Sequence, residues 1–233
     1  GAPGIDLNFG CPAKTVNKSR GGATLLRTPA VIYDVCKAVR DATPPDIPVT
    51  AKVRLGFDDD GQFEDITHNA FASGITELTV HARTKVQAYR PPAHWSTLRS
   101  IHNSRGIPVI ANGEIWTPSD LLQCRKVSGC NAFMLARGAV CRPDLARAIL
   151  AHDQGQRVDP MTWEEITELL VHFFDANGAL YERKFAINPV KQWLVYLQYA
   201  YPQAAALFAQ IKRIRDPDPM RAALIGANQS VAA

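Results

Sequence analysis

The stretch IDLNFGCPAKTVNKSRGGA, from Ile5 to Ala23, begins as a short apolar strand and runs directly into a glycine, a cysteine and a proline. The same order of features recurs along the first two-thirds of the 233-residue chain: a short β-rich run ends in polar or glycine residues, and an amphipathic helix follows. The five runs are GIDLNFG (4–10), IPVTAKVRL (47–55), ELTVHAR (77–83), IPVIANGEI (107–115) and AFMLARG (132–138).

Helix signals separate these runs. Thr28-Pro29 reads as an N-cap followed by Pro at the first helical position, and Thr117-Pro118 repeats that signal. Apolar residues after Pro29 then recur at i, i+3, i+4 and i+7, which predicts one buried helix face. Two further helices are expected at 62–73 and 93–104.

Apolar strands that alternate with helices indicate a parallel sheet covered by helices. The repeat length fits either a (β/α)8 TIM barrel or a doubly wound sheet. Because a closed barrel has eight strands and five units are visible, we expect about three units upstream of Gly1, so that the chain is an N-terminally truncated barrel.

The pattern becomes wholly helical from Trp163 onward. We therefore predict two domains, a partial barrel at 1–155 and an all-α domain at 156–233. Candidate helices of the second domain are 162–177, 187–200, 203–215 and 218–227. Its aromatic residues are expected to form its core rather than a platform for nucleobases; they are Trp163, Phe173, Phe174, Trp193, Tyr196 and Phe208.

Composition narrows the class of protein. The chain is 46% hydrophobic, but it has no apolar run long enough to cross a bilayer and does not open with a signal peptide. Its five cysteines form no Cys-x-x-Cys pair, which argues against a zinc site or a disulfide framework. We expect a cytoplasmic protein without metal or membrane contact, and a monomer, although the sequence leaves the oligomeric state open.

Charge is distributed unevenly along the chain, whose formal net charge is +4. Residues 1–54 carry eight Lys or Arg against four Asp or Glu, and residues 183–233 carry seven against two. Residues 155–182 carry one basic residue against six acidic ones. Two basic zones can steer a polyanion, although ordinary surface charge explains them equally well.

Polar residues follow each predicted strand. Because catalytic groups of such barrels lie where strands end and loops begin, the set predicts an active site at one rim. Any one of these residues alone is better explained as an ordinary loop residue. The set comprises Asn8, Cys11, Lys52, Arg54, His81, Arg83, Asn112, Gly113, Glu114, Arg137 and Gly138.

Four of these positions suggest an anionic ligand. Gly113 and Gly138 would let the backbone approach a phosphate, and Arg137 would add a charge, although a tight turn explains either glycine as well. Lys52 lies on an apolar strand, where a lysine is costly unless it meets an anion such as a reduced flavin. His81 could be a second contact there, or a structural histidine.

Cys11 has three possible roles. A nucleophile needs a partner that lowers its pKa, and no Cys/His motif is visible nearby. A protonated thiol could act as a general acid. A small buried hydrophobe fits Cys36, Cys124 and Cys130 better than Cys11, because Gly10 and Pro12 place Cys11 in a loop.

These motifs resemble the tRNA-dihydrouridine synthases. The match rests on DLNFGCP with the following RGGA, then KVRLG, HARTKVQAYR, PVIANGEI and MLARGA, in the same order and spacing. The pair GCP and H-x-R-T-x-x-Q-x-Y is the specific part. Within the family, the motifs KVRLGFD, NGEIW and KQWLVYL resemble the bacterial C-type branch, which is associated with the uridine at position 16 of the D-loop.

The resemblance implies a barrel enzyme with FMN, a helical tRNA-binding domain and NADPH as reductant. Hydride would pass from the flavin to C6 of a flipped-out uracil, and Cys11 would protonate C5. Asn8 matches the family's uracil-binding asparagine. Lys52 and His81 match its flavin contacts, and the FMN loops correspond to Asn112, Gly113, Glu114, Arg137 and Gly138. Arg54, Arg83 and Tyr89 are assigned to the substrate side.

The resemblance also implies that tRNA phosphates lie on the two basic zones, at Lys14, Lys18 and Arg20 and at 183–221. Two alternatives remain open at this point. One is another FMN barrel oxidoreductase that acts on a small pyrimidine or enone. The other is a non-catalytic, truncated tRNA-binding protein, since the family's first strands are not part of this sequence.

Overall fold

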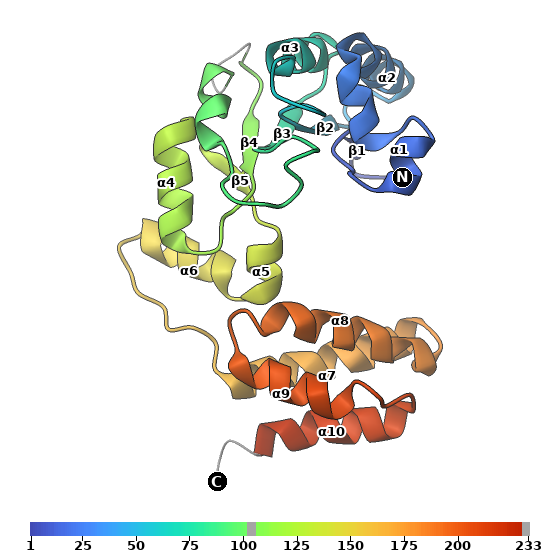
Figure 1. The fold of residues 1–233 in the computed structure, drawn as a ribbon, viewed down its shortest axis with the longest axis vertical. Coiled ribbons are helices and arrows are strands. Elements are labelled where there is room, and N and C mark those ends of the chain that lie inside the picture. Colours follow the sequence, from blue (N-terminus) through green and yellow to red (C-terminus); the bar gives the residue numbers. More distant parts are fainter. Residues whose placement is uncertain (102–105, 230–233) are drawn as a thin grey trace. The chain divides into compact units, whose positions relative to one another are not determined.

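The computed structural model describes residues 1–101 and 106–229 (Figure 1). Contacts divide the chain into two compact units, Gly1–Ala136 and Arg137–Ala233. This division precedes the predicted domain boundary at 155/156, because the short helix α5 (Arg137–Cys141) packs against α8 (Ile187–Leu197) in the second unit. The indole Nε1 of Trp193 donates to the carbonyl of Val140 there, at 2.9 Å. The two units are described separately.

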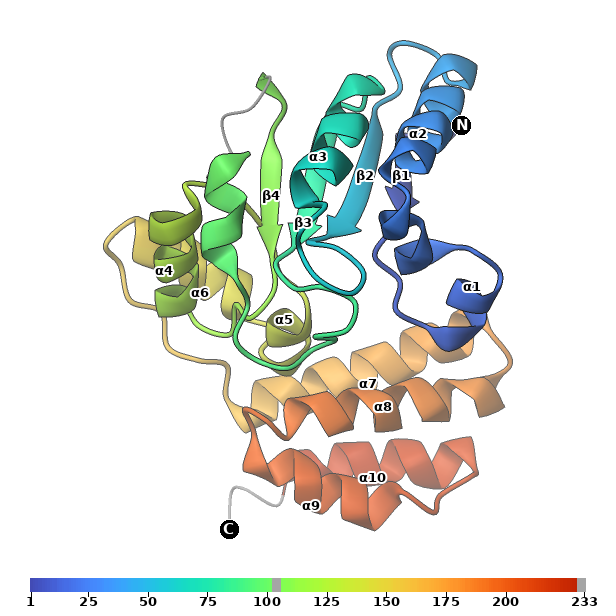
Figure 2. The same ribbon diagram turned by 45° about the horizontal axis from the view of Figure 1, so that its top comes forward.

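The first unit is built on a five-stranded parallel sheet whose strands pair in chain order (Figure 1). Figure 2 shows β1 to β4 from another side. A doubly wound sheet reverses its strand order partway, whereas a (β/α)8 barrel does not. The unbroken order is therefore that of a barrel wall, which confirms the predicted α/β barrel class. The strands are β1 (Ile5–Asn8), β2 (Val49–Arg54), β3 (Glu77–His81), β4 (Val109–Asn112) and β5 (Ala132–Met134).

Helices connect these strands as the sequence indicates, with two differences. The Thr117 side chain accepts a bond from the Asp120 amide and forms a full capping box, whereas Thr28 makes no side-chain cap. The expected helix at 93–104 is a 3₁₀ helix at Trp95–Ser100, and residues 102–104 lie outside the described residues. The elements are α1 (Lys14–Lys18), η1 (Gly22–Arg27), α2 (Pro29–Ala42), α3 (Phe63–Ala72), η2 (Trp95–Ser100) and α4 (Pro118–Ser128).

The sheet has two chemically different faces. Strand β2 shows this best: Val49, Ala51 and Val53 are fully buried, while the side chains of the alternate residues lie on the other face. Register partners share a face, so Lys52 lies beside Asn8 on β1, and Arg54 lies beside His81 on β3. The strands are thus less uniformly apolar than the sequence pattern suggested, and the second face carries the polar groups.

The second unit is helical throughout and contains the four expected helices. Fully buried residues of its core include Ile166, Leu170, Val190 and Leu194. Five of the six aromatic residues predicted for this core belong to it: Trp163 and Phe174 are buried in it, and Phe173, Trp193 and Phe208 pack against it. The prediction was wrong for Tyr196, which is 40% exposed and lies outside this core. The helices after α5 are α6 (Leu145–Asp153), α7 (Trp163–Leu180), η4 (Arg183–Ala186), α8 (Ile187–Leu197), α9 (Pro202–Ile211) and α10 (Pro217–Gln229).

Within the described residues, 1–101 and 106–229, no helix is both long and apolar enough to cross a membrane.

Candidate active site

Polar side chains gather at the carboxyl edge of the parallel sheet. Arg54, His81 and Asn112 are successive register partners across β2, β3 and β4, one at the end of each strand. Lys52 lies two residues before Arg54 on β2, so its side chain is on the same face of the sheet. In the first unit, the structure therefore brings together the strand-end residues that the sequence singled out.

Lys52 and Asn112 form a pair on this face. The Lys52 ammonium donates to Oδ1 of Asn112 at 3.1 Å, and the Asn112 amide donates to the carbonyl of Met134 at 2.8 Å. Burial lowers the pKa of Lys52 to about 8, and the charge of Arg54 contributes to the shift. An ammonium has three donors, and in the described part of the chain one hydrogen bond from Lys52 is recorded. This group is therefore suited to bind an added anion.

Gly113 allows the chain to pass close to His81. Its φ of +116° disfavours any side chain, and a Cβ there would lie 2.9 Å from Cδ2 of His81. The Trp95 indole donates to the carbonyl of Gly113 at 2.8 Å and fixes this turn. The glycine after β4 thus holds the backbone against the imidazole, which is 6% exposed.

Arg83 is fully buried and bonds to groups in the loops after β3 and β4. Its guanidinium forms an ion pair with Glu114, and its Nε donates to the carbonyls of Arg90 and Pro92 at 2.7 and 3.2 Å. Glu114 has a φ of +59° and also accepts from the Trp116 indole at 2.8 Å. Arg83 and Glu114 therefore join the loop after β3 to the loop after β4.

The Cys11 loop is held by backbone contacts. The carbonyl of Cys11 accepts from the Asn17 side chain at 2.9 Å and from the Ala23 amide at 3.0 Å. Gly22, at a φ of +58°, packs so closely that a Cβ would lie 2.8 Å from the Cys11 carbonyl oxygen. Asn8 accepts from the Gly10 amide at 2.9 Å and shapes the turn before Cys11. The RGGA segment therefore folds back onto the cysteine.

Cys11 differs from the other thiols in accessibility. All five cysteines are free and lie within the described residues; Cys11 is partly exposed and the other four are buried. Burial raises the pKa of Cys36 to about 11 and that of Cys124 to about 12, and it also raises the pKa values of Cys130 and Cys141. A thiolate-directed reagent should therefore distinguish Cys11 from the rest.

We expect iodoacetamide at pH 8 to add one carbamidomethyl group to the native protein, at Cys11. Intact mass and peptide mapping measure this, and Cys11→Ala should take up none on the same timescale. Adducts at a buried cysteine of the native protein before Cys11 is modified would contradict this picture of the site.

The remaining predicted residues lie in two places. Tyr89 is 49% exposed in the loop after β3, with its ring 6.0 Å from that of His81. Arg137 and Gly138 begin α5, the first element of the second unit. Their roles in a ligand site stay a prediction.

Sequence reasoning missed several residues that shape this site. The Asn17 side chain donates to the carbonyls of Cys11 and Gly21, and the indoles of Trp95 and Trp116 donate to Gly113 and Glu114, two residues with positive φ. Gln87 was visible within the H-x-R-T-x-x-Q-x-Y motif: its Oε1 accepts from the Thr84 amide at 2.8 Å, and its Nε2 lies 3.1 Å from Nε2 of His94.

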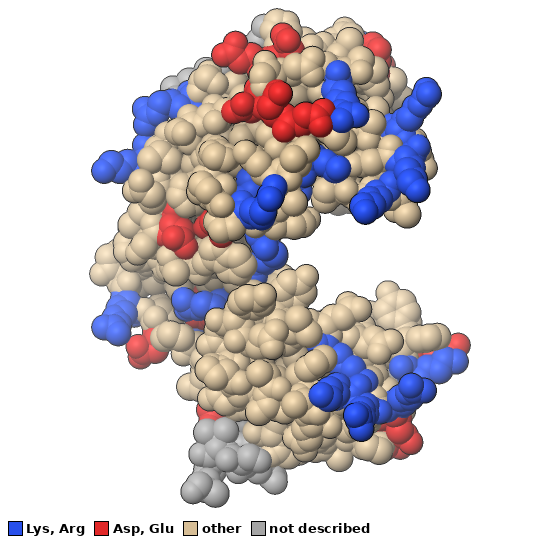
Figure 3. All heavy atoms as spheres, viewed as in Figure 1, with Lys and Arg blue, Asp and Glu red and all other residues tan. Residues whose placement is uncertain are grey.

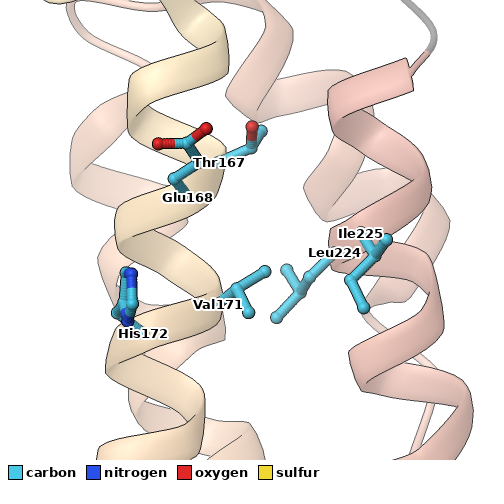
Figure 4. A pocket seen from close by; sticks show the side chains of 6 residues that line it. All are labelled: Thr167, Glu168, Val171, His172, Leu224 and Ile225. Carbon is cyan, nitrogen blue, oxygen red and sulfur yellow. The ribbon is translucent and has the colours of Figure 1, made fainter.

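A shallow groove on the second unit, between α7 and α10, is distinct from these groups. Figure 4 shows Val171 pointing across it toward Leu224. It is lined by Thr167, Glu168, Val171, His172, Leu224 and Ile225.

The fold and this edge define a parallel α/β protein of the barrel class with a polar site at the carboxyl ends of its strands. A family model described as dihydrouridine synthase matches residues 1–230. The chain belongs to the dihydrouridine synthase family.

Several relatives carry the name tRNA-dihydrouridine(16) synthase. The chain is 47% identical over 216 residues to the one from Aquipseudomonas alcaligenes, which covers 93% of this chain and 69% of the relative. It is 49% identical over 217 residues to that of Pseudomonas putida, covering 93% and 67%. For Neisseria meningitidis serogroup A the identity is 41% over 227 residues, covering 95% and 67%.

Proposed function

We propose that this protein is a tRNA-dihydrouridine synthase that uses FMN and NADPH to reduce a D-loop uridine, at position 16, to 5,6-dihydrouridine. The observation that carries the proposal is the partly exposed Cys11 at the mouth of β1, in a chain similar at 41–49% identity to proteins named for this product. Cys11 is the general acid.

The residues of the first unit fit a flavin mononucleotide. Lys52 is a half-buried cation with donors to offer, and such a group favours the electron-rich, anionic form of a reduced flavin. Asn112 is its hydrogen-bond partner, and His81 is the register partner of Asn112 on β3, so these groups lie at the same edge of the sheet. Gly113 is a proposed contact in the loop that follows Asn112. Arg137 and Gly138 are the proposed phosphate contacts. FMN, when bound, supplies the hydride that the substrate receives at C6.

The protein's own groups complete the reaction at the uracil. Asn8 is the last residue of β1, three residues before Cys11, and offers its side-chain amide to the pyrimidine edge. The Cys11 thiol donates its proton to C5 as the C5–C6 double bond is reduced, so that Cys11 becomes a thiolate and takes a proton from water afterwards. Tyr89, half exposed above His81, presents a ring on which an extruded base can stack.

The second unit offers a basic surface for RNA. We call the turn Leu180–Phe185 together with the loop Lys212–Asp216 the basic end of this unit. The two segments are neighbours, since η4 contacts α8 and α10 and the Lys191 ammonium donates to the carbonyls of Lys212 and Ile214. Figure 3 shows Lys and Arg gathered over this end. Its exposed cations include Lys184, Lys212, Arg213 and Arg215.

The basic end also exposes aromatic rings. Tyr181 is 64% exposed and Phe185 is 53% exposed, with the Lys184 ammonium 4.9 Å from the Phe185 ring. Exposed rings among cations suit an RNA loop, because every base has a face that can stack. On the first unit, Lys14, Lys18 and Arg20 in and beside α1 form the second proposed phosphate surface; Figure 3 shows basic groups there as well.

Binding to tRNA should weaken steeply with salt, and this dependence should come partly from the basic end. In the triple variant Lys212→Ala, Arg213→Ala and Arg215→Ala, the slope of log affinity against log salt should fall in magnitude by about two to three. Filter binding or fluorescence anisotropy at several KCl concentrations measures this. The control is a triple change to Ala of three acidic residues within 155–182, Asp159, Glu164 and Glu168, which should not reduce the slope. Equal slopes in all three proteins would contradict phosphate contacts at the basic end.

Dihydrouridine formation tests the function directly. The purified protein with FMN and NADPH should convert one uridine of tRNA that lacks dihydrouridine, and mass mapping identifies the position. It should leave free uridine unchanged. Turnover of free uridine at a similar rate would favour a small-molecule oxidoreductase, and flavin binding without turnover of either substrate would favour a non-catalytic tRNA-binding protein.

A further inference from the structure

Arg54 connects two loops that carry groups of the proposed site. Its Nε donates to the carbonyl of Gly10 at 2.8 Å, directly before Cys11. Its Nη1 donates to the carbonyls of Thr84 and Ala88 at 3.2 and 3.0 Å, and Ala88 is the residue directly before Tyr89. The guanidinium carbon lies 5.5 Å from the centre of the Tyr89 ring. One side chain thus reaches the residues that precede Cys11 and Tyr89.

We propose that Arg54 is a positioning residue, which holds the Cys11 thiol and the Tyr89 ring at a fixed separation across the substrate. This inference rests on the proposed function, and it replaces the expectation that Arg54 contacts the substrate. The residue is 2% exposed, and the hydrogen bonds of its Nε and Nη1 go to backbone carbonyls, so these donors are used within the protein.

A planar guanidinium suits this role better than other cations. Its donors spread in one plane, so it can bond to carbonyls of two separate loops at once, while the stem stays fixed by strand β2. Burial lowers the pKa of Arg54, and the nearby Tyr89 and Cys11 act in the opposite direction. A carbonyl that lost this donor inside the protein would be left unpaired, so each loop would shift to find another partner.

Arg40 provides a matched control. Its guanidinium also donates to three backbone carbonyls, those of Ile47, Thr43 and Pro44, at 2.7, 2.8 and 2.5 Å. These contacts join the end of α2 to the segment before β2, at the opposite edge of the sheet from Cys11. Arg40→Lys therefore removes an equivalent bridge without touching the proposed site.

The experiment compares Arg54→Lys with Arg40→Lys in single turnover. Both proteins are loaded with FMN and reduced by NADPH, and dihydrouridine formation on tRNA is followed. Arg54→Lys should reduce flavin as the wild type does and form product about tenfold to hundredfold more slowly, since small misplacements of reacting groups cost this much. Arg40→Lys should form product at the wild-type rate even if its thermal midpoint falls.

A second readout is independent of catalysis. The rate constant for alkylation of Cys11, followed against pH, should change in Arg54→Lys and stay unchanged in Arg40→Lys, because only the first variant frees the Cys11 loop. Equal product formation and equal alkylation profiles in the two variants would overturn the proposal. If Arg54→Lys does not fold, Arg54→Gln is judged by the same two criteria.

The two readouts also separate this inference from the proposed function. If the wild type forms no dihydrouridine, the function fails, and the alkylation profile still decides whether Arg54 holds the Cys11 loop. If the wild type is active and both Arg54 variants match it, the function stands and the positioning role fails.

Discussion

Cys11→Ala should bind FMN and accept electrons from NADPH like the wild type, yet form dihydrouridine about 10²- to 10⁴-fold more slowly, the range that general-acid catalysis contributes. The thiol is not among the proposed flavin contacts, and its backbone carbonyl, which Asn17 and Ala23 bind, is retained in the variant. Stopped-flow reduction of the flavin and single-turnover product formation measure the two steps separately.

Cys36→Ala is the control for the loss of a thiol. Cys36 is fully buried in α2, so its replacement should lower stability through lost packing and leave product formation unchanged. Cys11→Ser should recover little activity, because a hydroxyl is a much weaker acid than a thiol. Wild-type product formation by Cys11→Ala would refute the general-acid role, whatever its effect on stability.

Lys52→Met should lower the affinity for FMN and raise the stability of the flavin-free protein. Without the ammonium, affinity for FMN should fall about tenfold to hundredfold, which corresponds to one charge-assisted hydrogen bond. The flavin-free protein should become more stable near neutral pH, because a partly buried charge with a lowered pKa opposes folding.

The pH dependence gives this prediction a definite sign. The pKa of Lys52 is about 8 in the folded protein and near 10.4 in an unfolded chain, so between these values the unfolded state binds more protons. The contribution of Lys52 therefore makes the stability of the flavin-free protein rise with pH through this window. Lys52→Met should remove that contribution, as seen in denaturant unfolding from pH 7 to 10.

Lys37→Met is the matched control, since Lys37 is an exposed lysine paired with Asp41 at 2.5 Å. It should leave FMN affinity unchanged and keep the part of the pH dependence that Lys52 supplies. If Lys52→Met and Lys37→Met bind FMN equally well, Lys52 is not a flavin contact.

The sequence was sufficient to predict the main elements and the edge at which the polar groups meet. Strand length, alternation with amphipathic helices and the Thr-Pro signals are local properties, and they placed β1 to β5 and the starts of α2 and α4 correctly. The convergence of Arg54, His81 and Asn112 followed because parallel strands share one carboxyl edge.

The hydrogen-bond partners of the two buried arginines could not be predicted in the same way. Arg54 donates to backbone carbonyls of two other loops, and Arg83 donates to two carbonyls of its own loop and forms an ion pair with Glu114. A backbone carbonyl has no signature in the sequence. A charged residue at a strand end was therefore assigned to the substrate, as the family resemblance suggested. Likewise, Tyr196 was predicted to lie in the helical core but is 40% exposed, because which face of α8 it occupies depends on the packing of the other helices.

The order of the strands has a consequence for how the first unit folds. Each strand from β2 to β5 pairs with the strand that precedes it in the sequence, across a single crossover connection. Within the described sheet, each pairing joins two consecutive strands, so it can form as soon as the later strand of the pair has been made. The sheet can therefore grow one strand at a time in the order of translation. Each new strand covers the unpaired edge of the last, which shortens the time that any edge is open to another chain.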